Sequence, residues 1–187
     1  MNISRYLPAG ILLALVMLTG CDTVNPGGDT ILLTTEVDRT ADGGPIQFTF
    51  PGTLQTGRLV DLRCNCRVDL GPYLTTQGFS RSDIVSAEIV TARLVMGTPP
   101  TGNLSFLDQA LLKFESTGLS ATEVANRTGF LSSRESNLTV LSGRDISAFL
   151  EKASFEPVLQ IDASRLETNA TYQLYLVLTV RITVSGL

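Results

Sequence analysis

The sequence contains no histidine and no tryptophan. Without histidine, the chain cannot build a serine–histidine or cysteine–histidine catalytic pair, nor a histidine-based metal site. Without tryptophan, and with an aromatic fraction of only 6%, the aromatic platforms that sugar-binding modules usually expose are limited to Tyr73, Phe79 and Tyr175. The groups left for chemistry are carboxylates, hydroxyls, Lys113, Lys152 and the cysteines.

Charged residues are also sparse, at 17% of the chain, against about a quarter in an average domain. The formal net charge is −4, so the chain has no positive excess to attract nucleic acid or anionic lipid. Glycine, serine and threonine are plentiful, and this composition favours an all-β domain over a helical one.

A hydrophobic run long enough to span a membrane is missing near the start of the chain. The apolar run there covers Ile11–Leu18 and is preceded by Pro8 and Gly10. A membrane-spanning helix needs about 20 predominantly apolar residues. With Arg5 as a short positive region, residues 1–20 therefore have the organisation of a secretory signal peptide.

The signal-like segment ends in Leu18-Thr19-Gly20-Cys21, with a small residue directly before a cysteine. This motif resembles the lipobox of bacterial lipoprotein precursors. In that family the signal peptide is cut before the cysteine, which carries a diacylglyceryl thioether and usually a fatty acyl chain such as palmitate on its amine. The resemblance implies lipidation of Cys21, a membrane as partner, and a place in the bacterial cell envelope. It leaves the choice between inner and outer membrane open.

The resemblance divides the chain into a signal peptide (1–20), a lipidated cysteine with a short tether (21–29) and a body (30–187). Pro26, Gly27 and Gly28 in the tether disfavour regular structure. The eight residues after Cys21 reach at most about 28 Å, so we expect the body to lie close to the bilayer. The length of the body suits one domain.

Alternation of apolar and polar residues predicts β-strands through most of the body. The pattern is strongest over residues 60–70 and 171–184, where one face should belong to the core and the other to solvent. At roughly 40 Å, the second of these runs is expected to bend or to pair with different neighbours along its length. Further strands are predicted over residues 31–37, 46–50, 88–96, 110–115, 137–141 and 157–163.

Three segments carry a serine followed three residues later by an acid, a signature of helix N-termini. They are Ser80–Ile84, Ser120–Val124 and Ser142–Ile146, and each predicts a short helical turn. The third is the strongest prediction because Ile146, Phe149 and Leu150 share one helical face.

Seven or eight strands with only short helical turns indicate a single antiparallel β-sandwich domain. Residues 82–115 also loosely resemble small β-sandwich lipoproteins of unknown function from bacterial envelopes. That resemblance implies the same fold and no particular activity.

Cys64 and Cys66 lie two residues apart on the alternating run 60–70, so both are expected to face the core. An exported protein meets oxidising conditions, which favour a disulfide. Same-face Cα atoms in a strand lie about 6.6–6.8 Å apart, at the limit of disulfide geometry, so a bridge would need a kink or bulge. Three interpretations stay open: buried free thiols, a local disulfide and a redox pair.

Asp61 and Asp69 alternate with arginines on the solvent face of the same run. We interpret them as cross-strand ion partners and not as a catalytic carboxylate pair. The sequence contains no motif for a cofactor or a metal. We therefore expect a non-enzymatic binding or structural module that contacts an unknown envelope protein or glycan and no nucleic acid. Two alternatives stay open: an assembly subunit that donates its C-terminal strand, and a carbohydrate-binding module.

Overall fold

The computed structural model describes residues 29–54 and 57–186, so the predicted signal peptide, Cys21 and all of the tether except Asp29 lie outside the described residues. Nine strands and four short helical segments follow one another in the described part. Their bounds, in chain order, are β1 (Thr30–Val37), β2 (Gln47–Pro51), β3 (Val60–Arg63), α1 (Gly71–Thr76), η1 (Arg81–Asp83), β4 (Ile84–Thr98), η2 (Leu104–Phe106), β5 (Leu107–Glu115), β6 (Thr122–Thr128), β7 (Glu135–Val140), α2 (Ser147–Leu150), β8 (Glu156–Ala163) and β9 (Thr171–Ser185).

The strands form an antiparallel sheet in the order β1-β9-β4-β7-β6-β5-β8-β3, and β2 also pairs with β9. Along one side β9 pairs with β4; along the other it pairs with β1 near its C-terminal end and with β2 near its N-terminal end. β1 and β2 thus act as one edge strand interrupted by the loop 38–46. The prediction that the last strand pairs with different neighbours along its length is confirmed.

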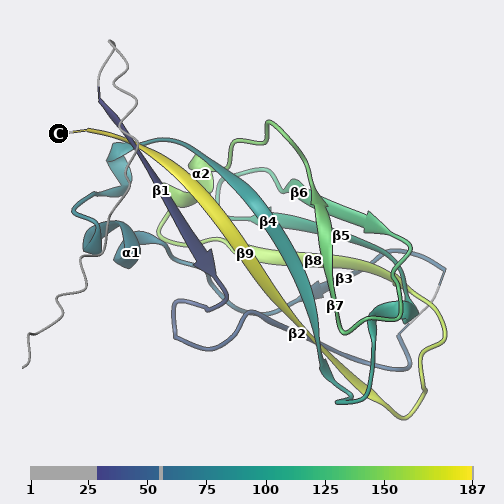
Figure 1. Ribbon diagram of the computed structural model, residues 1–187. Helices are drawn as coiled ribbons and strands as arrows, with labels where there is room; N and C mark the ends of the chain where they lie inside the picture. The colour runs from purple at the N-terminus through teal and green to yellow at the C-terminus, as the bar shows by residue number, and fades with distance from the viewer. Residues whose placement is uncertain (1–28, 55–56, 187) are drawn as a thin grey trace, which may run out of the picture.

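β7 joins the two parts of this sheet. Its residues 135–138 pair with β4, whereas Thr139 and Val140 pair with β6. β4 carries three register shifts against β9, and such bulges increase the bend and twist of a strand. The sheet is accordingly curled, and Figure 1 shows β4 and β9 crossing obliquely over β5 and β8.

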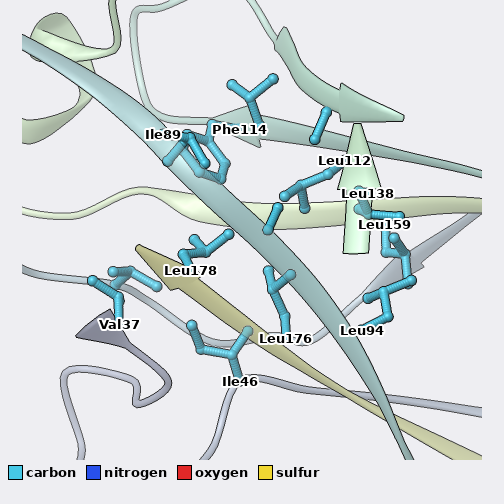
Figure 2. Close-up of a cluster of buried hydrophobic side chains, with 14 of the residues drawn as sticks. Val37, Ile46, Ile89, Leu94, Leu112, Phe114, Leu138, Leu159, Leu176 and Leu178 are labelled. Carbon is cyan, nitrogen blue, oxygen red and sulfur yellow. The ribbon is translucent and has the colours of Figure 1, made fainter. Parts of the chain in front are cut away.

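One hydrophobic core cluster takes side chains from both parts of the sheet. Figure 2 shows Leu176 and Leu178 of β9 together with Leu94 of β4 and Leu112 of β5 in this cluster. The even-numbered residues of β9 are buried from Tyr172 onward, and the residues between them are half-buried or exposed. The predicted core face of this strand is therefore confirmed, and each large side chain on it stabilises the fold by about 1.5–3 kcal/mol.

The strand predicted over residues 60–70 is wrong beyond Arg63. β3 pairs with β8 only as far as Arg63, after which Asn65 adopts a φ of 50° and breaks the extended conformation. Val68 returns to the sheet as an isolated bridge with Phe155. The alternation of apolar and polar residues predicted one long strand, because a local change in backbone direction does not alter that pattern.

A helix follows where the sequence predicted the end of that strand. α1 begins at Gly71, with Pro72 in its first turn. Proline is tolerated there because the first amides of a helix have no intrahelical partner. Gly71 and Pro72 therefore start an element instead of only ending one.

The three predicted helical turns have different outcomes. The first is confirmed as η1, where the Ser80 N–H and hydroxyl donate to Asp83 Oδ2 at 2.7 and 2.8 Å and lower the pKa of that carboxyl. The second is wrong, because β6 begins at Thr122, which raises the strand count to nine. The third helix begins later than predicted, at Ser147 of α2, and its predicted apolar face is buried.

Candidate functional site

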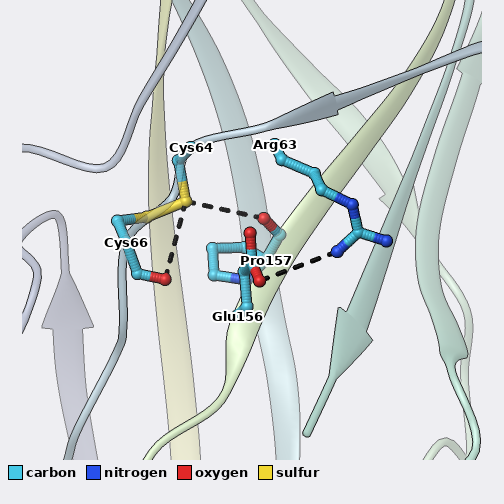
Figure 3. The surroundings of a disulfide bond; sticks show 5 residues. All are labelled: Arg63, Cys64, Cys66, Glu156 and Pro157. Carbon is cyan, nitrogen blue, oxygen red and sulfur yellow. Dashed lines mark hydrogen bonds and ion pairs between the residues drawn. A yellow bond between two sulfur atoms is a disulfide. The ribbon is translucent and has the colours of Figure 1, made fainter.

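The chain after β3 forms a tight turn closed by a disulfide between Cys64 and Cys66, whose Cα atoms lie 5.0 Å apart. Asn65 lies between them in the left-handed region, which asparagine tolerates better than most residues. Figure 3 shows Cys64 Sγ near the carbonyl oxygens of Cys66 and Pro157, at 3.8 and 3.7 Å. Both cysteines are half-buried in a turn and not in the core of a strand, and the turn supplies the kink that a bridge requires.

Arg63, just before this turn, links the end of β3 to the ends of β5 and β8. Its guanidinium donates to both carboxylate oxygens of Glu115 on β5, at 2.8 and 3.1 Å, and lies 3.6 Å from Glu156 on β8. The hydrogen bond to Glu115 is the main cause that raises the pKa of Arg63. Since these side chains are partly exposed, the pairs stabilise the fold only modestly, and their main effect is to fix the relative positions of the strand ends.

A depression of about 550 Å³ opens beside this network. Three segments far apart in the sequence surround it: the end of the disulfide turn, the β5–β6 connection and the α2–β8 connection. We call it the loop-end depression. Its lining residues are Arg67, Glu115, Ser116, Thr117, Leu119, Ala121, Lys152, Ala153, Ser154, Phe155 and Glu156.

Backbone hydrogen bonds hold two cation-bearing segments of this depression side by side. Val68 and Phe155 exchange N–H···O bonds of 2.8 and 3.0 Å, which fixes Arg67 close to the segment that carries Lys152. The Arg67 carbonyl also accepts from the N–H of Ala41 at 2.7 Å. The position of Arg67 is therefore set by the sheet and by the β1–β2 loop, while its side chain is exposed.

The ion pairing around the loop-end depression is uneven. Glu115 and Glu156 both face Arg63, whereas Arg67 and Lys152 form no ion pair with any residue that the structure describes. Two exposed cations without an ion-pair partner among the described residues thus line a depression that is also lined by Ser116 and Thr117. A guanidinium and an ammonium at one site bind carboxylate or phosphate oxygens well, because both donors are charged.

Glu156 adds a second polar feature to the lining of the depression. Its Oε1 is buried and has no hydrogen-bond donor among the described residues. A buried carboxylate oxygen is stabilised when a donor reaches it. Arg67 and Lys152 can therefore donate hydrogen bonds to a ligand in the depression, whereas the unpaired oxygen of Glu156 lies beneath its surface.

The two aspartates predicted as cross-strand ion partners are placed differently. Asp69 pairs with Arg81 of η1, which is not a neighbouring strand, and it also accepts from the Gly71 N–H at 2.7 Å. Asp61 does face β8, but its partner there is Gln160, a neutral donor at 2.5 Å. The geometry therefore corrects the interpretation of both residues, and neither lines the loop-end depression.

The three candidate aromatic residues are half-buried and lie against different elements. The Tyr73 hydroxyl donates to the Thr34 carbonyl of β1 at 3.3 Å, and burial raises the pKa of Tyr73. The ring of Tyr175 covers Gly97 of β4, where a Cβ atom would lie 2.5 Å from it. Phe79 packs against the hydrophobic core cluster, so all three aromatics have local packing roles, and no signal in the sequence pointed to Arg67 as a candidate.

Within the described residues, no group of three or more cysteine and carboxylate side chains could hold a metal ion. Nor does that part of the chain contain a helix with the length and hydrophobicity needed to cross a membrane. No protein-family model matches the chain, and the comparison with curated proteins gives no match. The site is therefore interpreted from its own geometry.

Proposed function

We propose that the protein is a lipid-anchored envelope protein that binds a small anionic ligand in the loop-end depression and does not catalyse a reaction. The observation that carries this proposal is that Arg67 and Lys152 both line the depression, with no ion-pair partner among the described residues. The hydroxyls of Ser116 and Thr117, which also line the depression, suit a ligand that carries hydroxyl groups as well. Acidic sugars and hydroxy acids combine these two features.

The binding proposal is tested by melting the full-length protein in the presence of acidic monosaccharides and hydroxy acids. A ligand that binds only the folded state raises the melting temperature in a concentration-dependent way. We expect a saturable rise for the wild-type protein and its loss when Arg67→Gln is combined with Lys152→Gln.

A matched control removes the same charge elsewhere. Arg58 and Arg165 are exposed and do not line the loop-end depression. The double variant Arg58→Gln with Arg165→Gln should keep the ligand-induced rise. A rise of unchanged size in the Arg67/Lys152 variant would show that the ligand binds elsewhere and would refute the assignment of the site.

Membrane anchoring rests on the lipobox motif and on Cys21. The expected product has a multi-chain lipid anchor, which holds a protein on a membrane far longer than one acyl chain does. Metabolic labelling with a fatty-acid analogue should mark the wild-type protein, and Cys21→Ser should abolish the label. An unlabelled wild-type protein in the soluble fraction would contradict the anchor.

Strand donation is a weaker alternative because β9 already has partners along both of its edges within its own chain. A strand that is donated to a neighbouring subunit pairs with the sheet of that subunit, so it cannot also keep its partners in its own chain. A monomer in mild detergent supports the binding module, whereas a ladder of oligomers would support donation.

We also propose that the curled sheet is a two-layer β-sandwich, with β1, β9 and β4 in one layer and β5, β8 and β3 in the other. The shared hydrophobic core, with residues from both layers, supports this description. An experimental structure with a hydrated interior between the layers would favour a half-barrel.

A further inference from the structure

Three large apolar side chains are exposed at one end of the sheet. Ile31 and Leu32 on β1 are 43% and 61% exposed, and Val85 on β4 is 55% exposed. We call these three residues the apolar tip. Exposed apolar side chains that gather at one place on a surface mark sites of interaction with other molecules or membranes.

The strand register places the three residues of the apolar tip at the same end of the sheet, with Ile31 and Leu32 on opposite faces of β1. Ile31 and Leu32 pair with Val184 and Thr183 near the end of β9. On the other side of β9, Ile84 and Ser86 of β4 pair with the same two residues, and Val85 is the extra residue in the register shift between them. The tip is thus formed by β1 and β4, which flank β9 at the level where β9 ends.

The path toward Cys21 leaves the sheet at this same end. Asp29, immediately before β1, accepts a backbone hydrogen bond from Gly186, immediately after β9. Asp29 is only eight residues from Cys21, a contour length of at most about 28 Å. If Cys21 is lipidated, the apolar tip is the part of the body that the tether brings closest to the bilayer.

We propose that the apolar tip inserts into the interface of the membrane that holds the lipid anchor, so that the body sits on the bilayer in one fixed orientation. This inference rests on the proposed anchoring at Cys21. Apolar side chains next to a lipid anchor bury their surface among headgroups and upper acyl chains and add to the strength of attachment. The tether makes this contact intramolecular, so even a small apolar surface can be occupied.

Two observations favour a bilayer over a second protein strand as the occupant. Along β9 and β4 the nearest charged residues, Arg181 and Glu88, neutralise each other in a pair at 2.8 Å, and the acids at the strand ends, Asp29 and Asp83, suit the polar interface of a neutral lipid surface and not its acyl core. The Tyr73 hydroxyl bonds the Thr34 carbonyl on β1 and so covers part of the edge that another strand would need.

The test uses the absence of tryptophan from the chain. Leu32→Trp and Val85→Trp each place a single tryptophan in the apolar tip. Leu131→Trp is the matched control, because Leu131 is 73% exposed and follows β6, where the chain approaches Met96 at the opposite end of β4. Each full-length lipidated variant is reconstituted into phosphatidylcholine vesicles with either ordinary or brominated acyl chains.

Flotation with the vesicles first establishes anchoring, and a melting curve establishes that each variant is folded. We expect brominated lipid to reduce the emission of Leu32→Trp and Val85→Trp by about half, since an interfacial group reaches the boundary of the acyl chains. The emission of Leu131→Trp should be the same in both kinds of vesicle.

A protein that floats while all three tryptophans emit equally in both vesicles would overturn the docking proposal and leave the anchor intact. A blue shift at Leu32→Trp and Val85→Trp without bromine quenching would also overturn it, and would indicate a second copy of the chain at the tip. A wild-type protein that does not float would refute the anchor itself, and the docking proposal with it.

Discussion

Asp145 holds the loop before α2 against β4. Its Oδ1 accepts from the N–H groups of Ala87 and Ser147 at 3.0 and 2.9 Å, and its Oδ2 accepts from the Ser147 hydroxyl at 3.0 Å. The Ala87 carbonyl in turn accepts from the Ile146 N–H at 2.8 Å. The loop thereby supplies hydrogen-bond partners to the backbone of β4 at Ala87, a part of β4 that precedes its pairing with β7 from Ala92 onward.

Asp145 should therefore contribute to stability in a pH-dependent way. Burial acts to raise its pKa, but the hydrogen bonds from Ala87 and Ser147 outweigh burial and lower it. Because the folded-state pKa is the lower one, the contribution is complete above the unfolded pKa of about 3.9 and is lost as pH falls through the folded-state value. At neutral pH we expect Asp145→Ala to lower the free energy of unfolding by about 1 kcal/mol.

Urea denaturation at neutral pH and near pH 3 measures this difference. Asp145→Asn keeps an oxygen acceptor and should lose less stability than Asp145→Ala at neutral pH. The gap between wild type and Asp145→Asn should narrow as the pH falls toward 3, because the unfolded wild-type chain then binds a proton at Asp145 more readily than the folded chain does. A gap of constant size at both pH values would mean that the charge of Asp145 does not matter.

The disulfide closes a very short loop, because Cys64 and Cys66 are separated by a single residue. Chain entropy gives such a cross-link a stabilising effect of only about 1.6 kcal/mol. We expect the double variant Cys64→Ser with Cys66→Ser to stay folded and to unfold at a slightly lower urea concentration. Loss of the cooperative transition in this variant would show that the turn is essential to the fold.

At the scale of elements, β9 is the strand on which the sheet depends. Leu176→Asp places an unpaired charge at a fully buried position and should unfold the domain. Thr179→Asp lies on the other face, where Thr179 shares a hydrogen bond of 2.7 Å with Thr91, and should cost far less. Circular dichroism and urea denaturation of both variants measure the contrast. Equal damage would show that β9 is buried on both faces.

The sequence predicts a strand most clearly where one face is buried along the whole length. β9 is such a strand, and its alternation was readable. β6 was missed because Val124 and Ala125 are adjacent and both buried, next to a register shift against β5, so its pattern has no period of two. In residues 60–70 the alternation continued where the backbone did not, since a left-handed Asn65 leaves no trace in hydrophobicity.

At the scale of the whole molecule, the loop-end depression could not be predicted because its parts meet only in the folded chain. Lys152 was already a candidate by residue type, but Arg67 looked like one more charge on a strand. Their neighbourhood depends on the bridge between Val68 and Phe155, which joins segments almost ninety residues apart. The cysteine motif and the last strand are local in sequence, so they could be recognised without the fold.

If the protein acts by binding and not by proton transfer, its carboxylates outside the depression should be dispensable for function. Asp61 accepts a hydrogen bond from Gln160, and Asp69 pairs with the half-buried Arg81, so both have structural partners. We expect Asp61→Asn and Asp69→Asn each to lower stability by at most about 1 kcal/mol, since partly exposed pairs contribute little. Both variants should complement a deletion strain as well as wild type does. A variant that keeps its melting curve but fails to complement would favour a catalytic carboxylate, because folding and anchoring would both be intact.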